Sequence, residues 1–281
     1  MEMILPDFGS AAVWMSLLTL TFLEIVLGID NIIFISITAG KLPKEQQKRA
    51  TNIGLVLAMV IRILLLFGIS WLVAMQAPWI KFGEESSNFY GAFSGQSIIL
   101  ILGGLFLLYK SVTEIHHKLD GEGHIANGEK KKNYISLNKA IMEITLINIV
   151  FSFDSILTAI GMTNGLSGAF FIMVVAVVAS VVIMMLFANP VGRFVNEHPS
   201  LQILGLSFLI LIGFMLIAEG AHLAHFRFAG SEIGAVPKGY LYFAIAFALL
   251  VEFLNMRLRK KSKPVQLHGV QEEAKAEGLY E

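Results

Sequence analysis

The chain has 281 residues, of which 56% are hydrophobic and only 15% are charged, and its mean hydropathy is +0.71. Soluble domains carry about 25% charged residues, so this composition argues against a soluble enzyme. The 21 basic and 21 acidic residues balance and no cysteine is present, which excludes the basic excess of a nucleic-acid-binding protein, disulfides, thiolate metal sites and thiol catalysis.

Seven long apolar segments predict helices that cross a membrane. A span needs about 20 apolar residues for a hydrocarbon core of roughly 30 Å, and lipid offers no partners to open backbone. We therefore expect an all-α membrane protein with seven transmembrane helices. The first ten residues lack Lys and Arg, so the first span is not expected to be a cleaved signal peptide. The segments cover approximately residues 12–38, 51–75, 96–111, 139–163, 168–188, 201–219 and 239–256.

The basic residues gather in alternate connecting segments. Most of the 21 Lys and Arg residues follow the first, third, fifth or seventh span, whereas the other connections hold only Lys81, Arg227 and Lys238. The positive-inside rule then predicts an N-terminus outside and a C-terminus in the cytoplasm. In this arrangement residues 112–138 are a cytoplasmic linker and residues 257–281 a cytoplasmic tail.

Two pairs of matching segments predict an internal repeat. EIVLGIDNI at 24–32 aligns with NIVFSFDSI at 148–156, which pairs Asp30 with Asp154, and LILGGLFLL at 100–108 aligns with LILIGFMLI at 209–217. The repeats would be spans 1–3 (residues 1–111) and spans 4–6 (139–219), with the outer loop and span 7 (220–256) added. Three spans per repeat force opposite orientations, and inverted repeats are typical of transporters whose substrate site lies near the midplane.

Polar side chains inside the spans define the candidate site, because a charge at the bilayer centre costs about 2.5–3.5 kcal/mol on insertion scales. Carboxylate, amide and hydroxyl oxygens suit hard cations such as magnesium, calcium or manganese. A helix break at Gly28 would bring two of the acids onto one cavity. The expected metal-binding residues are Glu24, Asp30, Asn31, Asn148, Asp154 and Ser155, and the secondary candidates are Glu143 and Glu219.

Arg62 lies inside the second span and needs a partner there. It could form a fixed ion pair with an acid of span one or four, or it could act as a charge-balancing group when the cation leaves. An empty carboxylate cluster should bind protons, because burial and like charge both favour the protonated form. We therefore expect cation/proton exchange by alternating access.

The segments LEIVLGIDNI, FSFDS and PKGYLYFAIAFALLVEFLN, with the Gly-Gly of span three and the following TEIH, resemble the TerC family over residues 10–256. The resemblance implies a LysE-type exporter in a bacterial plasma membrane, named for tellurium resistance, that carries divalent metal, chiefly manganese. It also implies that the family's acidic positions fall on Glu24, Asp30 and Asp154. Asn148 stands where the family usually has another acid, and Glu143 lies five residues earlier, about one and a half turns away.

Other functions fit parts of the same pattern. An intramembrane aspartyl protease also uses two carboxylates, but the residues before the two aspartates, Ile29 and Phe153, depart from its Gly-Asp pattern. An amino-acid exporter would need Arg62 for the substrate carboxylate, and a non-transport role would make the acids structural. We expect no enzymatic activity, resident cofactor or nucleic-acid partner. The expected partners are a divalent metal ion and the lipid bilayer, and a homodimer is compatible with the sequence.

Overall fold

The computed structural model describes residues 5–68, 75–84, 87–123, 134–163 and 166–259. For Ile29, Asp30, residues 120–123, Asp154 and Arg259 it describes the backbone alone. The chain divides into two compact units, Met1–Leu241 and Tyr242–Glu281, and each is described by itself.

The described residues form seven helices that are long and apolar enough to cross a membrane, which confirms the predicted helical class and the seven predicted spans. The structure contains short strands only outside these helices. The helices are α1 (Ala11–Gly40), α2 (Lys44–Phe67), α4 (Gly95–Gly123), α5 (Leu137–Thr163), α6 (Ala169–Glu197), α7 (Pro199–Leu223) and α8 (Lys238–Arg259).

Three helices differ from the predicted spans by more than four residues. The fifth span was expected to end at residue 188, but α6 continues to Glu197. The second span was expected to reach residue 75, but α2 ends at Phe67 and is capped by Gly68. The third was expected to end at residue 111, but α4 continues to Gly123, through part of the predicted linker. The apolar run measures how much of a helix could face lipid. The helix α4 extends beyond it because a polar side chain such as Glu114 finds ionic partners in Lys110, one turn earlier in α4, and in Lys41, just after α1.

Two short hairpins join the ends of α2, α4, α7 and α8. β1 (Pro78–Phe82) pairs with β2 (Gly91–Ser94), and β3 (Arg227–Phe228) pairs with β4 (Ser231–Glu232), both antiparallel. The two hairpins meet at a bridge between Tyr90 and Arg227. Five aromatic rings from both hairpins pack together there, namely Phe82, Phe89, Phe93, Phe226 and Phe228. These strands were not predicted, because they are too short to stand out beside the long apolar runs of the helices.

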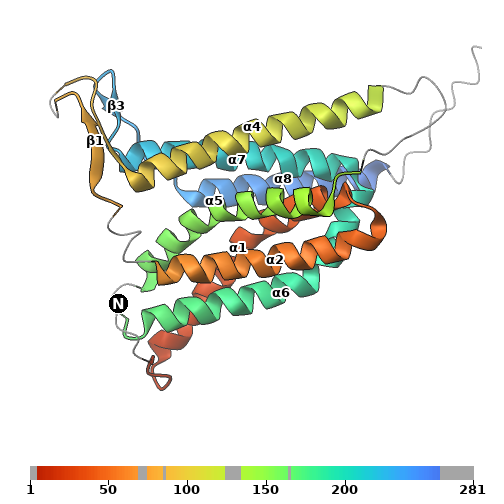
Figure 1. Ribbon diagram of the computed structural model, residues 1–281, viewed down its shortest axis with the longest axis horizontal. Coiled ribbons are helices and arrows are strands. Elements are labelled where there is room, and N and C mark those ends of the chain that lie inside the picture. The colour runs from red at the N-terminus through yellow and green to blue at the C-terminus, as the bar shows by residue number, and fades with distance from the viewer. Residues whose placement is uncertain (1–4, 69–74, 85–86, 124–133, 164–165, 260–281) are drawn as a thin grey trace, which may run out of the picture. The chain divides into compact units, whose positions relative to one another are not determined.

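Helix packing within the unit Met1–Leu241 brings distant parts of the chain together. α4 lies along α7, α1 packs against α6, and α2 packs against α5 (Figure 1). The apolar core between α1, α2, α5 and α6 consists of Ile32, Ile35, Leu55, Ile144, Val181, Met184 and Ala188. This four-helix region surrounds the candidate site.

The predicted helix break at Gly28 is wrong, because α1 is a continuous helix from Ala11 to Gly40. A Cβ atom added at Gly28 would lie 2.1 Å from the sulfur of Met184 on α6. Gly28 therefore allows a close approach of two helices, which is a common use of small residues in membrane proteins.

Candidate functional site

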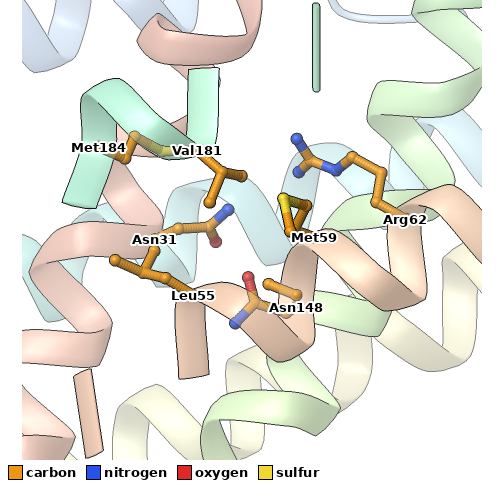
Figure 2. A pocket seen from close by; sticks show the side chains of 8 residues that line it. Asn31, Leu55, Met59, Arg62, Asn148, Val181 and Met184 are labelled. Atoms are coloured by element: carbon orange, nitrogen blue, oxygen red, sulfur yellow. The ribbon is translucent and has the colours of Figure 1, made fainter. Parts of the chain in front are cut away.

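A small cavity of about 10 Å³ lies among α1, α2, α5 and α6. Its size is close to the lower limit for one water molecule, so a single water or ion is the largest occupant that this conformation could hold. The amide groups of Asn31 and Asn148 point toward one another across it (Figure 2). The lining residues are Asn31, Leu55, Ala58, Met59, Arg62, Asn148, Val181 and Met184.

Asn31 presents a buried acceptor at this cavity. The side chain is almost fully buried, and its Oδ1 has no hydrogen-bond partner among the described residues. A buried polar atom without a partner costs about 1–3 kcal/mol, so such an atom in a folded protein calls for a water, an ion or a functional reason. On α5, the Asn148 Nδ2 donates a hydrogen bond to the Ile144 carbonyl at 2.8 Å. The Oδ1 of Asn148 then points toward Asn31 (Figure 2).

Arg62 lines the same cavity and forms an ion pair with Glu24 of α1. Both side chains are buried, with 6% and 1% of their surfaces exposed. The predicted partner of Arg62 was an acid of span one or span four, and in the structure it is Glu24 of span one. Glu24 belongs to the predicted ligand set, but in this conformation its carboxylate faces the guanidinium and is not among the groups that line the cavity.

The two predicted central aspartates are placed by their backbones only. Asp30 immediately precedes Asn31 in α1, and Asp154 follows Asn148 by six residues in α5, which corresponds to about 9 Å along the helix axis. Their side chains lie outside the described residues. Ser155 is buried on α5, its Oγ donates to the Ser152 carbonyl at 3.2 Å, and it is not a lining residue of the cavity.

The two secondary candidates lie away from the cavity. Glu143 of α5 pairs with Lys110 of α4 at 3.0 Å, and the structure therefore places it at a different cluster from Asn148. Glu219 lies one turn before the end of α7 and is not a lining residue. Within the described side chains, no group of three or more His, Asp or Glu residues could hold a metal ion.

Sequence reasoning missed two methionines that line the cavity, Met59 and Met184. Met59 lies three residues before Arg62, so the helical period alone could have placed both side chains on one face of α2. Met184 carries no such signal, because α6 has no charged residue before its last two turns. The two methionines add polarisable thioethers to the cavity wall, beside its amide groups.

Seven helices that are long and apolar enough to cross a bilayer define the class of integral membrane proteins. Residues 9–266 match the family described as "Integral membrane protein TerC family". The chain belongs to the TerC family, and the resemblance of its motifs is thereby confirmed.

Several curated bacterial proteins are similar to most of the chain. It is 44% identical over 253 residues to the Escherichia coli K12 "UPF0053 inner membrane protein YgdQ", covering 90% of this chain and 95% of that protein. It is 42% identical over 251 residues to a Haemophilus influenzae "UPF0053 protein", covering 89% and 96%. It is also 41% identical to the Escherichia coli "UPF0053 inner membrane protein YoaE", but spans only 44% of that protein's length. No solved structure matches the chain.

Proposed function

We propose that this chain is a membrane transporter that exports divalent metal cations from the cytoplasm, with manganese as the favoured ion. The observation that carries the proposal is the buried Asn31 Oδ1, which faces a cavity of one-ion size and has no hydrogen-bond partner among the described residues. The neighbouring position in the chain is the carboxylate residue Asp30. Amide and carboxylate oxygens together suit a hard or borderline divalent cation.

Helix packing supports the further proposal of two inverted repeats, α1–α2–α4 and α5–α6–α7. In this proposal α1 corresponds to α5, α2 to α6 and α4 to α7. A two-fold axis would then relate the packing of α1 on α6 to the packing of α5 on α2, and would pair α4 with α7; all three contacts are present. Gly104 and Gly213, aligned in the sequence match, each lie within 3 Å of the other's carbonyl if a Cβ is added. The cavity lies between helices of both halves, where inverted-repeat transporters bind substrate.

The proposed setting is the inner membrane of a bacterium. The relatives YgdQ and YoaE are named inner membrane proteins, and we extend that location to this chain. The distribution of basic residues supports an N-terminus outside and a C-terminus in the cytoplasm. A common ancestry with LysE-type exporters belongs to the same proposal and rests on the motif resemblance.

In the proposed site Asp30 and Asp154 are the central ligands, and Asn31 and Asn148 supply neutral oxygens. Arg62 is the charge-balancing residue: it holds Glu24 while the site is empty, as in the ion pair of this conformation. Ser155 supports the site through α5, as its buried position allows. Because carboxylates brought together favour protonation, cation binding would release protons, and we propose cation/proton exchange. The chain would act as a carrier, without enzymatic activity or resident cofactor.

An amino-acid exporter is the less supported alternative. Such a substrate would need a cation for its carboxylate. Among the described residues that line the cavity the cation is Arg62, which already pairs with Glu24. A divalent cation needs no such exchange of partners. An aspartyl protease would keep its activity in a metal chelator, so loss of function in a chelator separates that alternative from the carrier.

The test is cation flux into vesicles that contain the purified chain. We expect manganese transport by the wild type, at least tenfold slower transport by Asp30→Asn and Asp154→Asn, and normal transport by Glu197→Gln, which removes an acid at the far end of α6. Reversal of the pH gradient should change the rate. Flux that is equal in the wild type and both aspartate variants would overturn the proposed site, and flux indifferent to the pH gradient would overturn proton exchange.

A further inference from the structure

Four charged side chains form a second cluster, away from the cavity, where α1 ends and α5 begins. The Lys110 Nζ on α4 lies 3.2 Å from the Glu114 Oε1 and 3.0 Å from the Glu143 Oε2 of α5. The Lys41 Nζ, just after α1, lies 2.5 Å from the same Glu114 oxygen. We call these residues, Lys41, Lys110, Glu114 and Glu143, the Lys110 network.

Measured along α1 and along α5, the network lies toward the same end of the candidate site. Glu143 precedes Asn148 by five residues on α5, or about 7.5 Å of helix rise, and Lys41 follows Asn31 by ten residues, or about 15 Å. α4 contributes no residue to the cavity wall, yet it supplies two of the four network residues. The network therefore ties α4 to the ends of the two helices that present the amide groups.

Lys110 is the member on which the connection between α4 and α5 depends. Its single ammonium group lies between two carboxylates, and both carboxylates are largely buried, with 5% and 14% of their side chains exposed. Without this cation, Glu114 would keep Lys41 but Glu143 would lose the partner recorded here. A largely buried carboxylate without a counter-ion moves toward water or repels its neighbour, so α4 and α5 would separate at this end.

We infer that Lys110 is a gating residue that closes the cavity toward the end where α1 finishes and α5 starts. The inference rests on the proposed function, in which this end faces the cytoplasm and the cavity must open there to admit a cation. Opening separates Lys110 from Glu143, and the freed carboxylate then faces the incoming cation. An ion-pair network suits this role, because the desolvation cost of a buried pair offsets much of its Coulombic gain, and water reaches the separated charges once this end opens.

The same contacts would also be expected if the network only held the helices together, so the test must measure access to the cavity and not stability. The chain contains no cysteine, so a single introduced thiol can be followed without background. Ala58 lines the cavity from α2, and Ala58→Cys changes its side chain little. A charged, membrane-impermeant thiol reagent is added to vesicles of each orientation, and the labelling rate is measured from each side.

In the Ala58→Cys background we expect Lys110→Met to raise labelling from the α1 C-terminal side at least fivefold, with no change from the opposite side. Lys110→Arg, which keeps both ion pairs, should label like the parent. The matched control is Lys118→Met, which removes a lysine from the same helix whose recorded partner, Gln202, is on α7. Glu143→Gln breaks the network from α5 and should reproduce the Lys110→Met result, which covers the case in which Lys110→Met does not fold.

Equal labelling rates in the parent, Lys110→Met and Glu143→Gln would overturn the gate. An equal increase in Lys118→Met would also overturn it, because the effect would then be general loosening of α4. The manganese flux of the wild type is measured in the same vesicles. Flux with unchanged access refutes the gate alone, whereas increased access without flux of any divalent cation refutes the proposed cargo and leaves the closure by Lys110 standing.

Discussion

Asn31 and Arg62 show how the polar groups between α1, α2, α5 and α6 divide between stability and function. Arg62 and Glu24 satisfy each other and are buried together. Asn31 is equally buried, but its Oδ1 is left without a partner among the described residues. Removing one partner of a buried ion pair leaves an uncompensated charge, so the pair is needed for stability. A buried acceptor without a partner lowers stability, so its presence is better explained by a ligand that it binds.

Removal of one member of the Arg62–Glu24 pair should destabilise the protein more than removal of both. Arg62→Met leaves a buried carboxylate without its cation and should lower the free energy of unfolding by about 3–5 kcal/mol. The double variant Arg62→Met/Glu24→Gln should recover much of that loss. Thermal unfolding of the wild type, both single variants and the double variant in detergent gives the coupling energy. Additive effects of the two substitutions would contradict the ion pair.

Asn31→Leu should separate transport from stability. The substitution removes a buried oxygen that has no partner among the described residues, so the free energy of unfolding should stay the same or rise by about 1 kcal/mol. Manganese flux should fall at least tenfold, because the cavity loses one of its two amide groups. Melting temperature and vesicle flux are measured on the same preparation. A strongly destabilised Asn31→Leu protein would indicate that the amide has a structural partner and would remove the main support for the site.

The helices were predictable because their apolar runs are long enough to cross a bilayer, and four of the seven predicted spans agree with both helix ends to within four residues. Spacing alone did not reveal where polar side chains extend a helix, as Glu114 does in α4. It also gave the wrong role to Gly28, because a glycine that breaks a helix and one that admits a neighbouring helix look alike in a sequence. The contact with Met184 decides between them.

At the scale of helix pairs, the crossing of α4 and α7 should tolerate no side chain at Gly104. A Cβ there would lie 2.5 Å from the Gly213 carbonyl oxygen, so Gly104→Ala should lower the free energy of unfolding by about 1–3 kcal/mol. The matched control is Gly161→Ala in α5, where a Cβ meets no atom within 4 Å. That variant should be unchanged or gain up to about 1 kcal/mol from helix propensity. Equal melting temperatures for the two variants would contradict the close crossing.

For the whole molecule, the sequence predicted the membrane class and the TerC family, and both are confirmed. It also singled out Asn31, Asn148 and Arg62, which the fold brings to one cavity although they lie on three helices. Glu143 was predicted as a secondary candidate for the same site, but in the structure it forms an ion pair with Lys110. Three-dimensional neighbours from different helices cannot be read from spacing within one helix, which is why the Lys110 network and the methionines of the cavity wall were not foreseen.

The C-terminal end of the chain should be dispensable for transport. Residues 274–281 lie beyond the seventh helix and beyond the residues that match the family. We therefore expect a chain without residues 274–281 to reach the membrane and to transport manganese at the wild-type rate. The comparison is made in vesicles with equal amounts of each protein. A normally inserted but inactive truncated chain would show that the tail takes part in transport.

The most direct test of the central claim, carboxylate-dependent export of a divalent cation, is the metal content of living cells. Cells that lack their own manganese exporters are challenged with manganese while they express the wild type, Asp30→Asn or Glu197→Gln at equal levels. We expect low intracellular manganese with the wild type and with Glu197→Gln, and high manganese with Asp30→Asn. Equal manganese in all three would contradict manganese export as the function of this chain.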